Sequence, residues 1–241
     1  MKKINTSKRT NDSEIMDDFD LQGPELEVTL DDLDKVNKWL GGNKITLQGV
    51  KKLLLEHPGS NPISILDIGC GNGSMLREIA NWGRAAGYNL SLTGVDANSH
   101  AIEIAERKSE FFPEINYETL NIFSNDFRSR EYDIVLCTLT LHHFKDPEIE
   151  EIMTAFYRQA RLGIVINDLH RSRQAYILFK AFCKVFINNK IARDDGLTSI
   201  LRGFKKKELK KFAAQIPAAK QEIKWKWAYR YQWIIQKPQA K

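Results

Sequence analysis

The sequence predicts an α/β fold built on a mainly parallel sheet. From Pro62 onward, short apolar runs typical of strands alternate with segments of helical periodicity, and this alternation favours parallel strands joined by helices. A turn with glycines at alternate positions joins the first of these strands to the first of these helices. Two further strand-like segments end the chain and are close enough for an antiparallel pair. We therefore expect seven strands, of which the last two are antiparallel.

The composition fits one α/β domain. The chain has 241 residues, of which 42% are hydrophobic, and this is enough for one large core plus an added element. Cys70, Cys137 and Cys183 are scattered and odd in number, which argues for a reducing compartment and against a disulfide framework or a zinc site. Lys2 and Lys3 precede no apolar run, and no stretch reaches the roughly 18 apolar residues of a membrane span. We expect a cytoplasmic protein without a transmembrane segment or a bound metal.

The N-terminal region divides into two parts. Residues 1–28 are polar and weakly periodic, so we expect a flexible segment ahead of a single domain over residues 29–241. Two helical patterns follow, which end at Gly41-Gly42 and at Pro58-Gly59. We expect residues 29–60 to form cap helices over a ligand cleft.

The alternating pattern after Pro62 predicts the remaining strands and helices. Strand-like runs occupy residues 64–68, 90–95, 115–118, 132–137 and 163–167, and helical patterns occupy residues 74–86, 98–110 and 147–160. One long helical stretch then covers residues 171–188, followed by a helix over 205–215 and strands over 222–227 and 229–236. We expect residues 171–203 to be a helical insertion, whose aromatic stripe either covers a pocket or packs on the core.

The glycine-rich turn carries the strongest functional signal. Gly69-Cys70-Gly71-Asn72-Gly73 follows a strand and precedes a helix, and glycines in such a turn let a ligand approach the backbone. A dinucleotide-binding turn would need glycine at position 74, where this chain has Ser74. Asp67 before the turn would repel a pyrophosphate but suits an ammonium group. The run resembles the first motif of class I S-adenosylmethionine (SAM)-dependent methyltransferases, which implies a Rossmann-like fold with SAM as cofactor.

Strand ends supply the other candidate cofactor contacts, because ligands of parallel sheets bind at the carboxyl ends of the strands. Asp96 ends the second strand, where an acid can accept hydrogen bonds from both ribose hydroxyls, although it could also cap the next helix. The resemblance implies that Asn121 contacts the adenine amino group and that Ile122 packs on the ring; otherwise Asn121 is an ordinary loop residue. Our candidate cofactor-binding residues are Asp67, Gly69, Cys70, Gly71, Asp96, Ala97, Asn121, Ile122 and Thr138.

Two adjacent histidines follow the fourth strand. In the resembled family, this turn places residues beside the sulfonium methyl, and histidine can take up a proton near neutral pH. Asp168 ends the fifth strand, at the same sheet edge. We predict that His142 is a general base oriented by Asp168, with His143 as a further catalytic candidate. The alternative is that one histidine caps the next helix while the other packs on the cofactor.

A base indicates a hydroxyl acceptor, because a phenol must lose its proton before or during attack. The turn after the fourth strand lacks the Asp/Asn/Ser-Pro-Pro-Tyr/Phe pattern that is typical of amino-group methylation. Residues 167–173 resemble those of bacterial enzymes that act on phenolic or polyketide products. We therefore expect methylation of a small, apolar or aromatic acceptor, most simply at oxygen.

The charge distribution leaves alternatives open. Residues 171–241 carry 18 Lys and Arg against 4 Asp and Glu, although the whole chain has a net charge of only +5. This basic region could be a solvated surface, or it could attract an anionic partner. RNA or protein methylation therefore remains an alternative, as does a non-catalytic SAM-fold module. The sequence does not indicate the oligomeric state.

Overall fold

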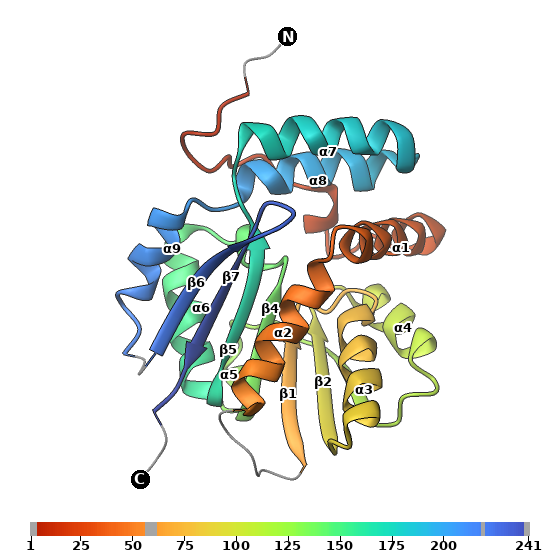
Figure 1. Ribbon diagram of the computed structural model, residues 1–241. Helices are drawn as coiled ribbons and strands as arrows, with labels where there is room; N and C mark the ends of the chain where they lie inside the picture. Colours follow the sequence, from red (N-terminus) through yellow and green to blue (C-terminus); the bar gives the residue numbers. More distant parts are fainter. Residues whose placement is uncertain (1–3, 56–61, 218–219, 239–241) are drawn as a thin grey trace.

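The computed structural model describes residues 4–55, 62–217 and 220–238. A single seven-stranded sheet has the order β3-β2-β1-β4-β5-β7-β6 (Figure 1). Neighbours from β3 to β5 are parallel, whereas β7 runs antiparallel between β5 and β6. This confirms the predicted sheet and its terminal antiparallel pair. The strands are β1 Ile63–Ile68, β2 Leu90–Asp96, β3 Ile115–Thr119, β4 Tyr132–Thr138, β5 Ala160–Leu169, β6 Lys220–Lys226 and β7 Arg230–Gln236.

Helices cover both faces of the sheet because successive strand residues point to opposite sides. Ile65 packs in the apolar cluster formed with helices α2, α3 and α4, whereas its neighbour Leu66 packs in the cluster on the other face. Among the described residues, no helix is both long and apolar enough to cross a bilayer. The covering helices are α2 Gly42–Leu55, α3 Ser74–Ala86 and α4 Ser99–Lys108 on one face, and α5 Asn125–Arg128, α6 Asp146–Gln159 and α9 Lys206–Ala213 on the other.

A third group of helices lies beyond the carboxyl ends of the parallel strands (Figure 1). It consists of α1 Gly23–Trp39, α7 Arg173–Phe186 and α8 Lys190–Arg202. Val36 of α1 packs with Cys183 and Ala192 of the other two helices in a small apolar cluster. The predicted insertion over residues 171–203 is therefore a helix pair. The two helices are separate because α8 has its own N-terminal cap: the side chain of Asn189 accepts the Ala192 N–H at 3.1 Å.

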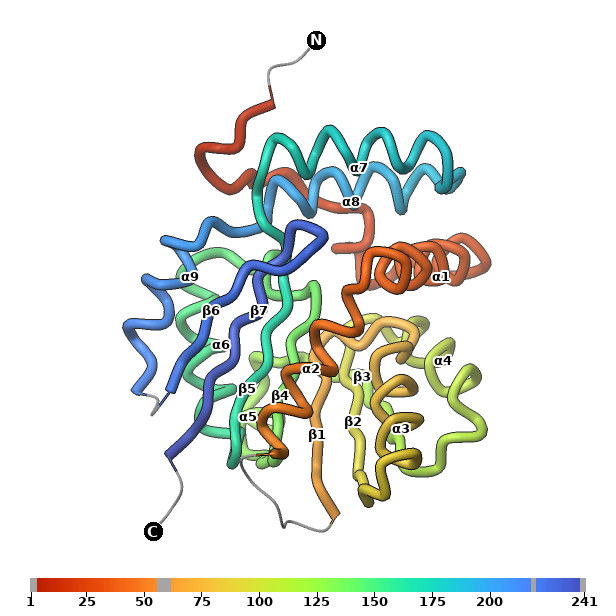
Figure 2. The backbone as a smooth tube through the Cα atoms, viewed as in Figure 1, coloured from red at the N-terminus to blue at the C-terminus, as the bar shows by residue number. Residues whose placement is uncertain are grey.

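Regular structure begins earlier in the N-terminal segment than the predicted boundary at residue 28. Helix α1 already begins at Gly23, and the short 3₁₀ helix η1 covers Ile15–Asp17. The backbone N–H groups of Ile15 and Met16 donate to Asp195 of α8 at 2.8 and 2.9 Å. Figure 2 shows this segment running beside α8. Its polar groups find partners about 180 residues further along the chain, which the local sequence pattern does not encode.

Helix α2 also differs from its predicted role as a cap. Its buried residues, which include Val50, Leu53 and Leu54, pack on the sheet with Ile65 and Val165. The approach is close, because a Cβ on Gly49 would lie 2.5 Å from Cγ1 of Val165. Of the two expected cap helices, α1 therefore has that position and α2 belongs to the core. The predicted end of the second helix at Pro58-Gly59 lies outside the described residues.

Candidate functional site

A cavity of about 1040 Å³ opens at the carboxyl ends of the parallel strands, beneath α1, α7 and α8. Pockets for one drug-sized ligand span roughly 300–1,000 Å³, so this cavity has room for a cofactor and a small second molecule. We call the wall formed by residues 67–75, 95–98 and 119–122 the glycine-turn half. We call the wall formed by Glu14, Asp17, His142, His143, Ser199 and Arg202 the histidine half.

The turn between β1 and α3 requires glycine for two reasons. Gly69, Gly71 and Gly73 have φ values of +68°, +53° and +75°, which residues with a Cβ rarely adopt. Space is also limiting, because a Cβ on Gly73 would lie 2.1 Å from Oη of Tyr117. Side chains are therefore excluded at these three positions, and a ligand can approach the backbone of the turn directly.

Asp96 ties the turn to the end of β2. Its carboxylate accepts hydrogen bonds from the backbone N–H groups of Gly71 and Asn98, both at 3.0 Å. Burial raises the pKa of Asp96, while these backbone donors act in the opposite direction. Asn98, not Asp96, caps α4, because its side chain accepts the N–H groups of His100 and Ala101. This leaves Asp96 on the cavity wall with lone pairs for ribose hydroxyls.

Asp67 is a buried acid without a counter-charge beside it. It is 2% exposed, and its Oδ1 has no hydrogen-bond partner among the described residues. Burial, followed by the negative charge of Asp96, raises the pKa of Asp67 to about 8. An ammonium group at this wall would supply both a hydrogen-bond donor and a positive charge. The site therefore fits a ligand of the SAM type on a structural criterion independent of the motif.

The predicted adenine contacts lie at the far end of the same wall. Ala97, Asn121 and Ile122 all line the cavity, at the ends of β2 and β3. Oδ1 of Asn121 accepts the Phe123 N–H at 2.9 Å, so one of its two lone pairs stays available for an adenine amino group. Their roles as cofactor contacts stay predictions.

Cys70 and Thr138 line the cavity less directly. The thiol of Cys70 packs in the apolar cluster on the α3 face, so close to Gly94 that a Cβ there would lie 2.9 Å from Sγ. Oγ1 of Thr138 lies 3.0 Å from Oγ1 of Thr46 in α2. Cys70 would therefore contact a ligand through its backbone. The hydroxyl of Thr138 could contact a ligand while it also interacts with the hydroxyl of Thr46.

In the histidine half, His142 is paired as predicted with Asp168, which lies outside the cavity lining. Nδ1 of His142 lies 2.8 Å from Oδ1 of Asp168, and both side chains are almost fully buried. The backbone N–H groups of His142 and Leu169 also donate to this carboxylate, at 3.1 and 2.6 Å. Burial alone would raise the pKa of Asp168, but the interactions with His142 lower it below its usual value. Because a carboxylate only accepts, the hydrogen bond assigns the proton to Nδ1 and directs the lone pair of Nε2 away from Asp168.

His143 pairs with a different acid. Its Nδ1 lies 2.6 Å from Oδ1 of Asp17, in η1, and its ring lies against that of His142 at an angle of 32°, with centroids 4.3 Å apart. Arg202 of α8 donates to the other oxygen of Asp17 at 2.6 Å. Burial would raise the pKa of Asp17, but the hydrogen bonds from His143, from the backbone of Glu14 and from Arg202 lower it well below its usual value.

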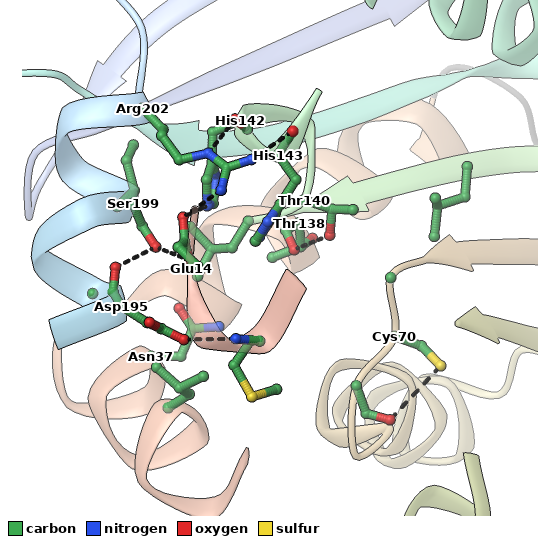
Figure 3. Close-up of a pocket in the computed structure, with 18 of the residues that line it drawn as sticks. Glu14, Asn37, Cys70, Thr138, Thr140, His142, His143, Asp195, Ser199 and Arg202 are labelled. Atoms are coloured by element: carbon green, nitrogen blue, oxygen red, sulfur yellow. Dashed lines mark hydrogen bonds and ion pairs between the residues drawn. The ribbon is translucent and has the colours of Figure 1, made fainter. Parts of the chain in front are cut away.

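Glu14, like Asp17, Ser199 and Arg202, is a residue of this half that the sequence did not reveal. Its Oε2 accepts the hydroxyl of Ser199 at 2.6 Å, and its Oε1 lies 3.7 Å from Nε2 of His142 (Figure 3). Neither Oε1 nor that Nε2 has a hydrogen-bond partner in the described chain. Burial raises the pKa of Glu14 to about 7. No local pattern marks Glu14, because its partners come from segments more than 120 residues away.

Glu14, His142 and His143 are close enough together to be considered as a metal site. The ligand atoms of Glu14, His142 and His143 lie within 4.8 Å of one another, and imidazole with carboxylate suits a divalent transition metal. However, Nη1 of Arg202 lies 3.5 Å from Oε1 of Glu14 and places a positive charge beside this group. That charge opposes a second cation, so the expectation of a site without metal stays a prediction.

Comparisons with known proteins agree with this geometry. A family model described as a methyltransferase domain matches residues 65–163. The ubiquinone biosynthesis O-methyltransferases of Rickettsia bellii (strain OSU 85-389) and Hydrogenovibrio crunogenus are 26% and 30% identical over 134 and 119 residues, which is 54% and 48% of this chain. These matches cover 51% and 46% of the relatives, so the chain spans about half the length of the curated relatives it matches.

Solved structures extend the likeness of the fold. The plantazolicin methyltransferase BpumL in complex with SAH has a TM-score of 0.65 at 18% identity, with 88% of this chain and 90% of that chain covered. The CurJ carbon methyltransferase has a TM-score of 0.60 at 15% identity, over 80% and 53% of the chains. At these identities the likeness concerns the fold alone. Together with the methyltransferase domain matched over residues 65–163 and the sheet order, it shows that the chain has the class I methyltransferase fold.

Proposed function

We propose that this protein transfers the methyl group of SAM to a hydroxyl oxygen of a small, apolar, phenolic acceptor, with His142 as the general base. The observation that carries the proposal is His142, which lines the same cavity as the glycine-rich turn and is paired with the buried Asp168. When bound, SAM supplies an electrophilic methyl group on its sulfonium. The remaining steps belong to residues of this chain.

The glycine-turn half would hold the cofactor. Asp67 pairs with the ammonium group, Asp96 accepts the ribose hydroxyls, and Asn121 accepts the adenine amino group while Ile122 packs on the ring. Because Asp96 is already held by the backbone of Gly71 and Asn98, its carboxylate is positioned before a ligand arrives. Little conformational entropy is then lost on binding.

His142 would remove the proton of the acceptor hydroxyl. A phenol with a pKa near 10 is mostly neutral at pH 7, and a positioned base typically contributes about 10²–10⁴-fold to the rate. Nε2 of His142 is suited to this role because it carries a free lone pair, while Asp168 holds Nδ1–H and stabilises the imidazolium that forms. Holding the nucleophile about 3 Å from the methyl group, in line with its bond to sulfur, supplies a further large part of the rate.

The walls next to the histidine half favour an apolar acceptor. Leu178, Phe179 and Phe182 of α7 line the cavity opposite Leu33 and Leu40 of α1. We infer that the helix pair both covers the pocket and packs on neighbouring helices, since residues of α7 also pack with α1 and α8. The relatives named ubiquinone biosynthesis O-methyltransferases support an oxygen atom on a small aromatic ring as the target.

The alternative of an RNA or protein substrate receives less support. Of the Lys and Arg residues in the basic C-terminal region, only Arg202 and Arg230 line the described cavity. Arg202 is engaged by Asp17, and the many lysines lie on helices and strands outside the cavity. Their placement favours a solvated basic surface.

The test is a reaction screen with labelled SAM. The protein is incubated with phenols, aromatic polyketides, lipids and tRNA, and the methylated product is identified by mass. We expect label on the oxygen of a phenolic compound. Transfer to tRNA alone, or tight SAM binding with no product from any class, would contradict the proposal.

A further inference from the structure

Arg230 is a buried cation that the proposed chemistry does not use. It begins β7 and is 2% exposed, yet it lines the cavity. Its Nε and Nη1 have no hydrogen-bond partner among the described residues. Burying a charged group without a partner is strongly unfavourable, so such groups in proteins are normally paired.

Asp168 attracts Arg230 but does not provide it with a free carboxylate partner. The carboxylate of Asp168 is already bound by His142 and by the backbone of Leu169. Burial lowers the pKa of Arg230 to about 10, so the guanidinium still carries its charge at pH 7. A positive charge with free donors therefore faces the cavity.

Gly42 lets Arg230 lie beside a second polar side chain. A Cβ on Gly42 would lie 2.8 Å from Cζ of Arg230 and 2.2 Å from Oδ1 of Asn37, so these two side chains occupy the space that a Cβ would need. Oδ1 of Asn37 is also buried without a partner, and Asn37 lines the cavity. A hydrogen bond between Asn37 and Arg230 would leave the charge uncompensated, because an amide is neutral. Gly42 is the first residue of α2, whose positive end adds to the local potential.

We propose that Arg230 binds a carboxylate group of a ligand in this cavity. The planar guanidinium matches a carboxylate in geometry. A singly charged group is favoured over a phosphate, because the carboxylates of Asp17 and Asp96 line the same cavity. The inference rests on the proposed function, which provides two possible sources of this carboxylate. One is the amino-acid carboxylate of SAM, and the other is a carboxylate on the acceptor.

The first arm of the test concerns the cofactor. Binding of SAH and of its analogue without the carboxylate is measured by calorimetry for the wild type, Arg230→Met and the surface control Arg173→Met. If SAM supplies the carboxylate, Arg230→Met weakens SAH binding by roughly 10- to 100-fold. The analogue then binds both proteins equally, and Arg173→Met changes neither ligand.

The second arm concerns the acceptor. The SAH-saturated protein is titrated with 4-butylbenzoate and with 4-butylbenzamide, which differ in charge but hardly in shape. If the acceptor supplies the carboxylate, the wild type prefers the benzoate by roughly 10-fold or more. Arg230→Met abolishes this preference, and Arg230→Lys restores part of it.

The outcomes separate this inference from the proposed function. The inference is overturned if neither ligand pair distinguishes the wild type from Arg230→Met. If Arg230→Met does not fold, the wild type alone still gives a result: equal affinity for both members of each ligand pair would overturn the inference. If the wild type fails to bind SAH, the proposed function fails instead, and the benzoate titration without SAH still reports on Arg230.

Discussion

The two halves of the cavity differ in how far apart in the sequence their residues lie. The glycine-turn half uses a contiguous turn after β1 and the ends of β2 and β3, and Gly71 and Asp96 are only 25 residues apart. In the histidine half, Glu14 meets Ser199 across 185 residues, and Asp17 meets His143 across 126. The first half can therefore form with the parallel sheet alone, whereas the second also requires the N-terminal segment and α8.

This difference predicts that the halves can be disabled separately. Changes in the glycine-turn half should weaken cofactor binding, whereas changes in the histidine half should reduce turnover and leave cofactor affinity intact. Three substitutions test this separation and a fourth tests the protonation of Asp67 in the glycine-turn half, in decreasing order of expected effect.

His142→Gln should have the largest effect, because it removes the base while keeping a polar side chain of similar reach. We expect kcat to fall about 10²–10⁴-fold at saturating SAM, while the Kd for SAH stays within about twofold. The control is His100→Gln, on α4 and outside the cavity, which should leave both quantities unchanged. Unimpaired turnover in His142→Gln would remove His142 from the mechanism.

Asp96→Ala should act on the other half. Loss of the acceptor for the ribose hydroxyls should weaken SAH binding by about 1–3 kcal/mol, as measured by calorimetry. Asp20→Ala, at an exposed position, is the control. An unchanged affinity would mean that Asp96 has been assigned the wrong role.

Glu14→Gln tests whether the N-terminal segment belongs to the site. The new amide can donate to Nε2 of His142, which lies 3.7 Å from Oε1 in the native protein, and so compete with the acceptor hydroxyl. We expect kcat/KM for the acceptor to fall about 10-fold, with unchanged SAH affinity. If activity matches that of the exposed control Glu25→Gln, the segment serves the fold and not the reaction.

Asp67→Asn should change the pH dependence of stability. The pKa of Asp67 is raised to about 8 in the folded protein, from an ordinary value near 4. Between these values the folded state keeps a proton that the unfolded state has lost, so stability falls as pH rises through this window. Asn has no proton to lose, and the fall should be shallower by about 1 kcal/mol per pH unit.

Urea unfolding of the ligand-free wild type and Asp67→Asn at pH 5, 6, 7 and 8 measures this difference. Glu14, whose pKa is raised to about 7, contributes a fall of the same sign in both proteins and cancels from the comparison. Identical slopes would mean that the carboxyl group of Asp67 is ionised in the folded protein.

The sequence alone was sufficient for the fold and for the glycine-turn half. The alternation of strands and helices, the turn at residues 69–73 and Asp96 at a strand end are local patterns, and each follows from the conformational preferences of a few neighbouring residues. The pairing of His142 with Asp168 was also predictable, because β4 and β5 are adjacent in a sheet of this kind and both residues lie near the carboxyl ends of these strands. The ligand roles of these residues stay predictions.

Only the tertiary structure decided the rest. The packing of α2 on the sheet, the order of the N-terminal segment and the positions of Glu14 and Arg202 depend on contacts between distant segments. Arg230 shows the limit most clearly, because its sequence neighbours do not distinguish it from the other basic residues of the C-terminal region. Its unpaired charge follows from burial against Gly42 and Asn37, and burial of this kind is a property of the assembled chain.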